Sequence, residues 1–125
     1  NPGETPFHLN LLTRDKRRFM RTKKLLHTEP KLVVGVPTFG WLRAAIDSMD
    51  VLNDADYVRG ITSPVLIVIA GDDHLIEAAH QVRVAQLLPQ GSRVTIPHAR
   101  HEILVETDDK RSAFWQAFDD LMTDN

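Results

Sequence analysis

Two aspartates and a histidine follow short apolar runs, and side chains of these types can cooperate in acid–base chemistry. Asp72 and Asp73 come after the apolar run at 65–69, and His101 follows the run at 93–96. A carboxylate that accepts a hydrogen bond from Nδ1–H of an imidazole fixes the ring tautomer and leaves Nε2 free to act as a general base. An acid followed along the chain by a histidine is the second half of a Ser…Asp…His charge relay. Either aspartate could be that acid, or a turn carboxylate that bonds its own backbone.

The elements around these residues predict a parallel βαβ unit. The continuous apolar run at 65–69 is typical of a strand buried on both faces, and Gly71 permits a sharp turn after it. A helix is predicted over 78–88, a second strand over 93–96 and a last helix over 108–122. Because the carboxyl ends of parallel strands meet at one edge of a sheet, we expect the aspartates and His101 to lie close together there.

The first part of the chain has helical periodicity. Thr13 or Asp15 could cap a helix that runs to about Leu26 and that Pro30 ends. A second helix is predicted to begin near Thr38, and residues 53–60 read as a polar turn. Along that helix an apolar stripe recurs at helical spacing: Trp41, Leu42, Ala45, Ile46, Met49 and Leu52. We therefore divide the chain into a helical cap or approach segment, 1–60, and a βαβα part, 61–125.

The composition fits a soluble globular domain. The chain has 125 residues, of which 42% are hydrophobic and 26% charged. It has no cysteine, which excludes disulfides and thiolate chemistry and fits a reducing compartment. No apolar run approaches the roughly 20 residues that span a bilayer, and no signal-peptide pattern opens the chain. These features predict a cytoplasmic protein, and the first residue, Asn1 rather than Met, leads us to expect that the start has been cut or processed.

Basic residues gather near the start of the chain. Residues 1–31 carry eight basic and three acidic side chains, whereas residues 32–125 carry seven basic and fourteen acidic ones. The basic stretch Arg14–Lys24 predicts either a solvated helix face or peripheral contact with anionic headgroups at the inner face of the membrane. The acidic remainder, with little aromatic interleaving, argues against a nucleic-acid partner.

Two further classes of function stay open from the pattern. His98, His101 and Glu102, with Asp72 or Asp73, could hold a divalent metal ion, although the order His-x-x-His-Glu is not that of a zincin. Alternatively, the chain is a non-catalytic module that binds lipid or protein through its basic helix and an apolar face. An unpaired strand edge and uncovered helix faces predict that the isolated chain self-associates.

Residues 64–115 resemble the carboxyl-terminal part of the α/β-hydrolase superfamily, in its lysophospholipase and monoacylglycerol-lipase-like branch. The stretch 70–76 resembles the acid loop of that branch. His101-Glu102-Ile103-Leu104-x-Glu106, followed by Arg111 and Phe114-Trp115, resembles its histidine loop and last helix. Earlier in the chain, the segments 10–13 and 35–41 resemble the cap and approach region of bacterial lysophospholipases.

The resemblance implies an α/β fold class, a partial α/β-hydrolase fold in which a parallel βαβ unit with flanking helices is preceded by a helical cap-like segment. It implies that Asp73, rather than Asp72, is the triad acid and that His101 is the base of a serine hydrolase, without cofactor or metal. The implied substrate is a lipid-like ester, such as a lysophospholipid or a monoacylglycerol. Phe39 and Trp41 match a cap region that shapes the acyl channel in such enzymes, although ordinary helix core explains them equally well.

The nucleophile of such an enzyme has no counterpart in this sequence. No Gly-x-Ser-x-Gly occurs, and none of the serines has the strand–turn–helix context of a nucleophile elbow: Ser48, Ser63, Ser92 and Ser112. We expect the elbow and the oxyanion loop to lie upstream of Asn1, in a missing amino-terminal half that is the partner of this chain. The isolated chain is then expected to be inactive, because nucleophile and oxyanion donors supply most of the rate enhancement.

Overall fold

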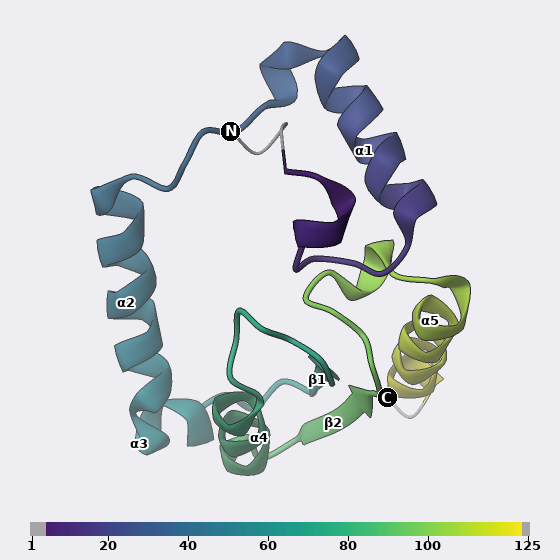
Figure 1. Ribbon diagram of the computed structural model, residues 1–125. Coiled ribbons are helices and arrows are strands. Elements are labelled where there is room, and N and C mark those ends of the chain that lie inside the picture. The colour runs from purple at the N-terminus through teal and green to yellow at the C-terminus, as the bar shows by residue number, and fades with distance from the viewer. Residues whose placement is uncertain (1–4, 124–125) are drawn as a thin grey trace.

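The computed structural model describes residues 5–123, and its two strands form one parallel sheet (Figure 1). Strand β1 spans Val65–Ala70 and strand β2 spans Gly91–Ile96, in register from Val65 opposite Gly91 to Ala70 opposite Ile96. Helix α4, Ala78–Leu87, connects the two strands and packs against both. The predicted parallel βαβ unit and the α/β fold class are therefore confirmed.

The exit from β1 depends on a glycine. The N–H of Gly71 donates to the carbonyl of Ile96 at 3.0 Å, which joins the ends of the two strands. A Cβ at this position would lie 2.9 Å from that same carbonyl oxygen, closer than real Cβ contacts come. The missing side chain therefore lets the two strand ends approach closely, and the two loops that follow the strands begin side by side.

The long helices begin at the residues that the sequence favours. Helix α1, Lys16–Thr28, is capped by Asp15, whose carboxylate accepts from the Arg18 N–H at 3.0 Å, so Asp15 rather than Thr13 is the cap. Thr38 caps helix α2, Phe39–Asn53, and helix α5 spans Asp108–Thr123. The described residues also form three short 3₁₀ helices: η1 at Phe7–Leu9, η2 at Pro30–Leu32 and η3 at Ile103–Val105.

The polar turn predicted over 53–60 is wrong. The short helix α3, Ala55–Arg59, occupies this region. The Asp54 side chain accepts from the N–H groups of Asp56 and Tyr57, and Val58 is fully buried. Asp54 and Gly60 are turn-type residues that here cap a five-residue helix at both ends, which explains why they read as a turn.

The buried core lies where the strands end. Ala70, Ile96 and Ala99 form its centre, and three partly buried side chains pack against them: Val68, Ile103 and Phe114. Two of these six residues belong to the loop after β2. Packing therefore holds that loop against the end of the sheet.

Helix α2 stands apart from the sheet, on the opposite side of the molecule from α1 (Figure 1). Its apolar stripe is exposed, with Trp41 at 60% and Ile46 at 56% of their full accessibility, and Phe39 is 91% exposed. The interpretation of Phe39 and Trp41 as ordinary core is wrong for this chain, because both side chains are mostly exposed. None of the described helices is long and apolar enough to cross a membrane. The division into 1–60 and 61–125 stays a prediction, and its residues 1–4, 124 and 125 lie outside the described part.

Candidate active site

The loops that follow β1 and β2 lie against each other at the carboxyl edge of the sheet. We call residues 71–76 the acid loop and residues 97–107 the histidine loop. Besides the contact of Gly71 with Ile96, the Asp72 N–H donates to the Ala99 carbonyl at 2.9 Å. Because backbone bonds fix the two loops to each other, side chains on one have a defined position relative to the other. Asp73 and His101 project from these loops, as the sequence predicted.

Asp73 meets His101 in a hydrogen bond. Oδ2 of Asp73 lies 2.9 Å from Nδ1 of His101. Oδ1 of Asp73 accepts from the N–H groups of Leu75 at 2.8 Å and Ile76 at 3.1 Å. The backbone of the acid loop therefore holds one oxygen of the carboxylate and leaves the other for the histidine.

The Asp73 carboxyl stays ionised despite its burial, with only 6% of its side chain exposed. Burial is the strongest single influence and raises its pKa. The N–H bonds from Leu75 and Ile76 and the neighbouring His101 together outweigh it and hold the pKa of Asp73 below its usual value. At neutral pH Asp73 is thus a carboxylate that can only accept hydrogen bonds, so Nδ1 of His101 must be the donor.

His101 keeps its second ring nitrogen available. Its side chain is 36% exposed, and no residue between 5 and 123 hydrogen-bonds Nε2. With Nδ1–H donated to Asp73, Nε2 carries the lone pair that accepts a proton. The described geometry is therefore that of an oriented general base.

Asp72 has different partners, although it is the neighbour of Asp73 in the chain. Its carboxylate forms an ion pair with Arg14 and lies 3.4 Å from Nε2 of His74. Arg14 also donates from Nε to the carbonyl of His98 at 3.0 Å, so its guanidinium bridges the acid and histidine loops. Of the two candidate acids, the structure brings only Asp73 to His101.

The metal-binding alternative finds no ligand cluster in the part of the chain that the structure describes. Within residues 5–123, no group of three or more His, Asp or Glu side chains is placed to hold a metal ion. His98 occupies a left-handed turn with φ 56°, and Glu102 is exposed. The side chains of the His-x-x-His-Glu pattern therefore do not converge with the aspartates on one point.

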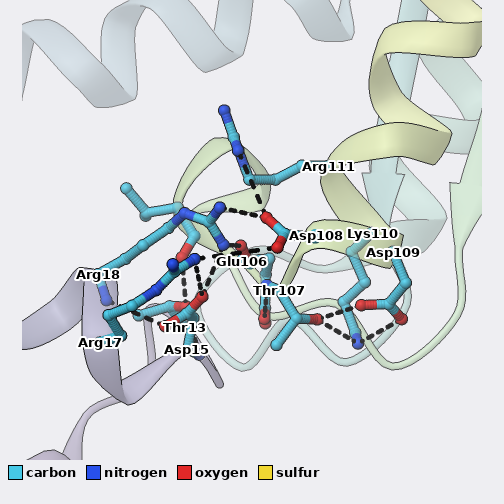
Figure 2. A network of polar contacts seen from close by, with 11 residues as sticks. Thr13, Asp15, Arg17, Arg18, Glu106, Thr107, Asp108, Asp109, Lys110 and Arg111 are labelled. Atoms are coloured by element: carbon cyan, nitrogen blue, oxygen red, sulfur yellow. Dashed lines mark hydrogen bonds and ion pairs between the residues drawn. The ribbon is translucent and has the colours of Figure 1, made fainter.

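A polar network holds the histidine loop in place where the starts of α1 and α5 meet (Figure 2). Arg18 reaches from α1 to the carbonyl of Glu106 at 2.7 Å, to Asp15 at 2.6 Å and to Asp108. Hydrogen bonding to Asp108 raises the pKa of Arg18, and Arg18 in turn lowers the pKa of Asp108. Only 13% of the Arg18 side chain is exposed. The basic stretch is therefore not one solvated face, since Arg14 and Arg18 are used inside the chain.

This supporting network and the burial of Glu106 were not predicted from the sequence. Glu106 is fully buried, and its carboxylate accepts from the Arg100 N–H at 2.8 Å and from the Thr107 N–H at 3.2 Å. A carboxylate directly after the apolar stretch 103–105 is the signal that could have found it. The contacts of Arg18 leave no such signal, because Glu106 and Asp108 lie far from it along the chain.

A parallel βαβ unit with an acid and a histidine at its carboxyl edge is an arrangement typical of α/β-hydrolases. Residues 7–108 match the protein family described as "Serine aminopeptidase, S33", and the chain belongs to this family. The predicted resemblance to lysophospholipase-like α/β-hydrolases is confirmed by this match and by the curated relatives.

The relatives include enzymes named lysophospholipase L2. The chain is 28% identical over 126 aligned residues to lysophospholipase L2 of Escherichia coli K12, which covers 93% of the chain and 36% of the relative. It is 26% identical over 102 aligned residues to probable lysophospholipase L2 of Haemophilus influenzae, which covers 82% of the chain and 32% of the relative. The chain thus spans about a third of the length of these relatives. No solved structure gives a significant match.

Proposed function

We propose that this chain supplies the acid and the base of a serine hydrolase, with Asp73 as the acid and His101 as the base. The hydrogen bond of 2.9 Å between Oδ2 of Asp73 and Nδ1 of His101 carries the proposal. It joins two loops at the sheet edge where α/β proteins bind their ligands. The non-catalytic alternative gives no reason for a buried carboxylate to face an imidazole whose other nitrogen is open.

The proposed reaction is acyl transfer through a serine nucleophile. None of the serines in these 125 residues lies in a nucleophile elbow. Nε2 of His101 takes the proton of the serine hydroxyl as its oxygen attacks the ester carbonyl. Asp73 stabilises the imidazolium that forms, and His101 then gives the proton to the departing alcohol. In the second half, His101 takes a proton from a water molecule whose oxygen attacks the acyl-enzyme, and it returns that proton to the serine oxygen as the fatty acid is released. Nucleophile and oxyanion donors belong, in this proposal, to a segment outside the chain, and the isolated chain is inactive.

The proposed substrate is a lipid-like ester, either a lysophospholipid or a monoacylglycerol. The names of the relatives support this class. A cavity of about 620 Å³ also supports it, because its lining includes Leu75 and Ile76, whose N–H groups bind Asp73. Ile46 and Met49 of α2 line it as well. A largely apolar space that adjoins the acid loop would suit an acyl chain.

We also propose that the protein is cytoplasmic and meets the inner face of the membrane through the stretch Arg14–Lys24. Arg14, Arg17 and Arg18 form ion pairs within the chain, so the contact would use other exposed cations of α1, such as Arg21 and Lys24. Flotation of the chain with vesicles of anionic and of neutral phospholipid tests this. Binding to the anionic vesicles that salt weakens is expected. Equal flotation with both kinds of vesicle, or none with either, would contradict the proposal.

Ester hydrolysis by the product of the complete gene tests the proposed function. His101→Ala should lower kcat by roughly three orders of magnitude or more, since removal of a triad member costs about that much. His98→Asn is the matched control, because asparagine tolerates the left-handed backbone of that position. The control should keep its activity. A folded His101→Ala variant that hydrolyses lysophospholipid at the wild-type rate would overturn the proposal.

A further inference from the structure

Glu106 is a buried charge with an unusual set of partners. No part of its side chain is exposed, and its two carboxylate oxygens accept from backbone N–H groups of Arg100 and Thr107. Burial of a carboxylate is costly unless its oxygens are well satisfied. These two hydrogen bonds therefore fix the fully buried side chain of Glu106 to the backbone of the histidine loop.

The two N–H groups lie at opposite ends of the turn that carries the base. Arg100 immediately precedes His101, and Thr107 immediately follows Glu106, so the carboxylate closes residues 100–107 into a ring. Helix η3, Ile103–Val105, is part of this ring of residues. With the N–H of Arg100 fixed, the backbone from which His101 projects has little freedom to shift.

The segment before α1 and the first turn of α1 hold the same ring from outside. The Thr13 hydroxyl donates to the carbonyl of Val105 at 2.7 Å, and Arg18 donates to the carbonyl of Glu106 at 2.7 Å (Figure 2). The Glu102 N–H donates to the carbonyl of Leu12 at 2.8 Å. Arg100, through its guanidinium, donates to the carbonyl of Asn10 at 2.7 Å. Residues 88 to 92 positions away along the chain thus hold the loop that carries His101.

We propose that Glu106 is a positioning residue for the histidine base. It touches no reacting atom in this account. By fixing the backbone before His101, it keeps Nδ1 within 2.9 Å of Oδ2 of Asp73 and so leaves Nε2 free. This inference rests on the proposed function for its consequence in catalysis, but its effect on the hydrogen bond between His101 and Asp73 is independent of activity.

The test uses Glu106→Gln, with Glu102→Gln as its matched control. Glutamine keeps the shape of glutamate but places an NH₂ donor against one of the two N–H groups, so the ring loses one bond. Glu102 lies in the same loop with an exposed side chain, and its bond to Leu12 uses its backbone, which the substitution leaves in place. Circular dichroism and thermal unfolding establish that both variants are folded.

Two measured quantities are expected to change in Glu106→Gln but not in the control Glu102→Gln. In the chain itself, the proton NMR signal of Nδ1–H of His101 should broaden or disappear through faster exchange with water. In the product of the complete gene, kcat should fall about tenfold to 100-fold with KM unchanged, as for a misplaced catalytic group. A folded Glu106→Gln variant that keeps both the Nδ1–H signal and the wild-type kcat would overturn the proposal, as would a change in KM alone.

Measurements on the wild-type chain cover the case in which Glu106→Gln does not fold. The amide hydrogens of Arg100 and Thr107 should exchange with solvent at least tenfold more slowly than that of the exposed Leu104, because Glu106 holds them both. Exchange of the Arg100 amide as fast as that of Leu104 would overturn the proposal. If His101→Ala instead left ester hydrolysis unchanged, the proposed function would fail. The effect of Glu106→Gln on the Nδ1–H signal of His101 would still test the positioning role of Glu106.

Discussion

Asp73 and His101 lie on different loops, and Nδ1 of His101 is 2.9 Å from Oδ2 of Asp73. The neighbouring Asp72 forms its ion pair with Arg14 instead. Two adjacent carboxylates therefore have separate tasks, since one faces the imidazole and the other joins the acid loop to the segment before α1. The different environments of the two carboxylates lead to the first prediction.

Asp73→Asn and Asp72→Asn remove the same charge from neighbouring positions. In the product of the complete gene, Asp73→Asn should lower kcat for ester hydrolysis by roughly three to four orders of magnitude, because the imidazolium loses its stabilising carboxylate and the ring its correct tautomer. Asp72→Asn should change kcat by less than about threefold, since a partly exposed ion pair contributes little. Steady-state kinetics of the two variants measures the contrast. Equal losses from both substitutions would contradict the assignment of the acid.

Acid should destabilise the chain through carboxylates whose pKa the fold lowers. A hydrogen bond from the Arg18 N–H lowers the pKa of Asp15, and hydrogen bonding and charge also hold the pKa of Asp73 and Asp108 below the usual value of 3.8. Their stabilisation is complete above that value and is lost as the pH falls through the lower pKa of the folded state. The free energy of unfolding, from urea titrations, should thus decline as the pH falls below about 4.

Asp15→Asn isolates one part of this pH dependence. Asparagine still caps a helix, so the substitution removes the titrating charge while keeping the cap. The slope of unfolding free energy against pH below about 4 should become smaller in this variant. An unchanged slope would show that the Asp15 carboxylate does not contribute to the pH dependence of stability. That result would contradict a stabilising ion pair between Asp15 and Arg18.

Gly71→Ala should destabilise the fold, whereas Gly35→Ala should not. A Cβ on Gly71 would come within 2.9 Å of the Ile96 carbonyl oxygen and 3.2 Å of Cα of Pro97, and both are backbone atoms that cannot move aside easily. The expected loss of stability is about 1–3 kcal/mol. Nothing lies within 4 Å of a Cβ added to Gly35. Urea unfolding measures the free energy of unfolding of the two variants. Equal stability would contradict the close approach of the two loops.

Self-association of the isolated chain should depend on the exposed stripe of α2. Trp41, Ile46 and Met49 are each more than half exposed and present apolar surface. Light scattering should find dimers or larger species, and Ile46→Lys with Met49→Lys should shift them toward monomer. Ser48→Lys, on the same helix, is the control and should leave the association unchanged. A wild-type chain that is monomeric at every concentration would contradict this prediction.

The elements of the core could be predicted from the sequence, because each has a strong local pattern. The apolar run ending at Ala70 and the helix that follows it predict the βαβ unit and place Asp73 and His101 at one edge. Pattern alone could not choose between Asp72 and Asp73. The choice depends on the turn in which Leu75 and Ile76 donate to Asp73, and both aspartates are compatible with such a turn by type.

The supporting contacts could not be predicted, because they join residues far apart in the chain. Arg18 reads as one more cation of a basic helix, and only the folded chain brings it to Glu106 and Asp108. The exposure of Trp41 had no local signal either, since an apolar helix stripe predicts a partner surface without identifying it.

The tautomer of His101 tests the central claim most directly. The measurement is a two-bond ¹H–¹⁵N correlation spectrum of the ¹⁵N-labelled chain in mildly alkaline buffer, in which histidine rings are neutral. The wild-type chain should show His101 with its proton on Nδ1. In Asp73→Asn, the amide oxygen accepts from Leu75 and Ile76 as the carboxylate did, so the NH₂ group faces Nδ1 and the proton should move to Nε2. A wild-type His101 protonated on Nε2, or a tautomer that Asp73→Asn leaves unchanged, would contradict the relay.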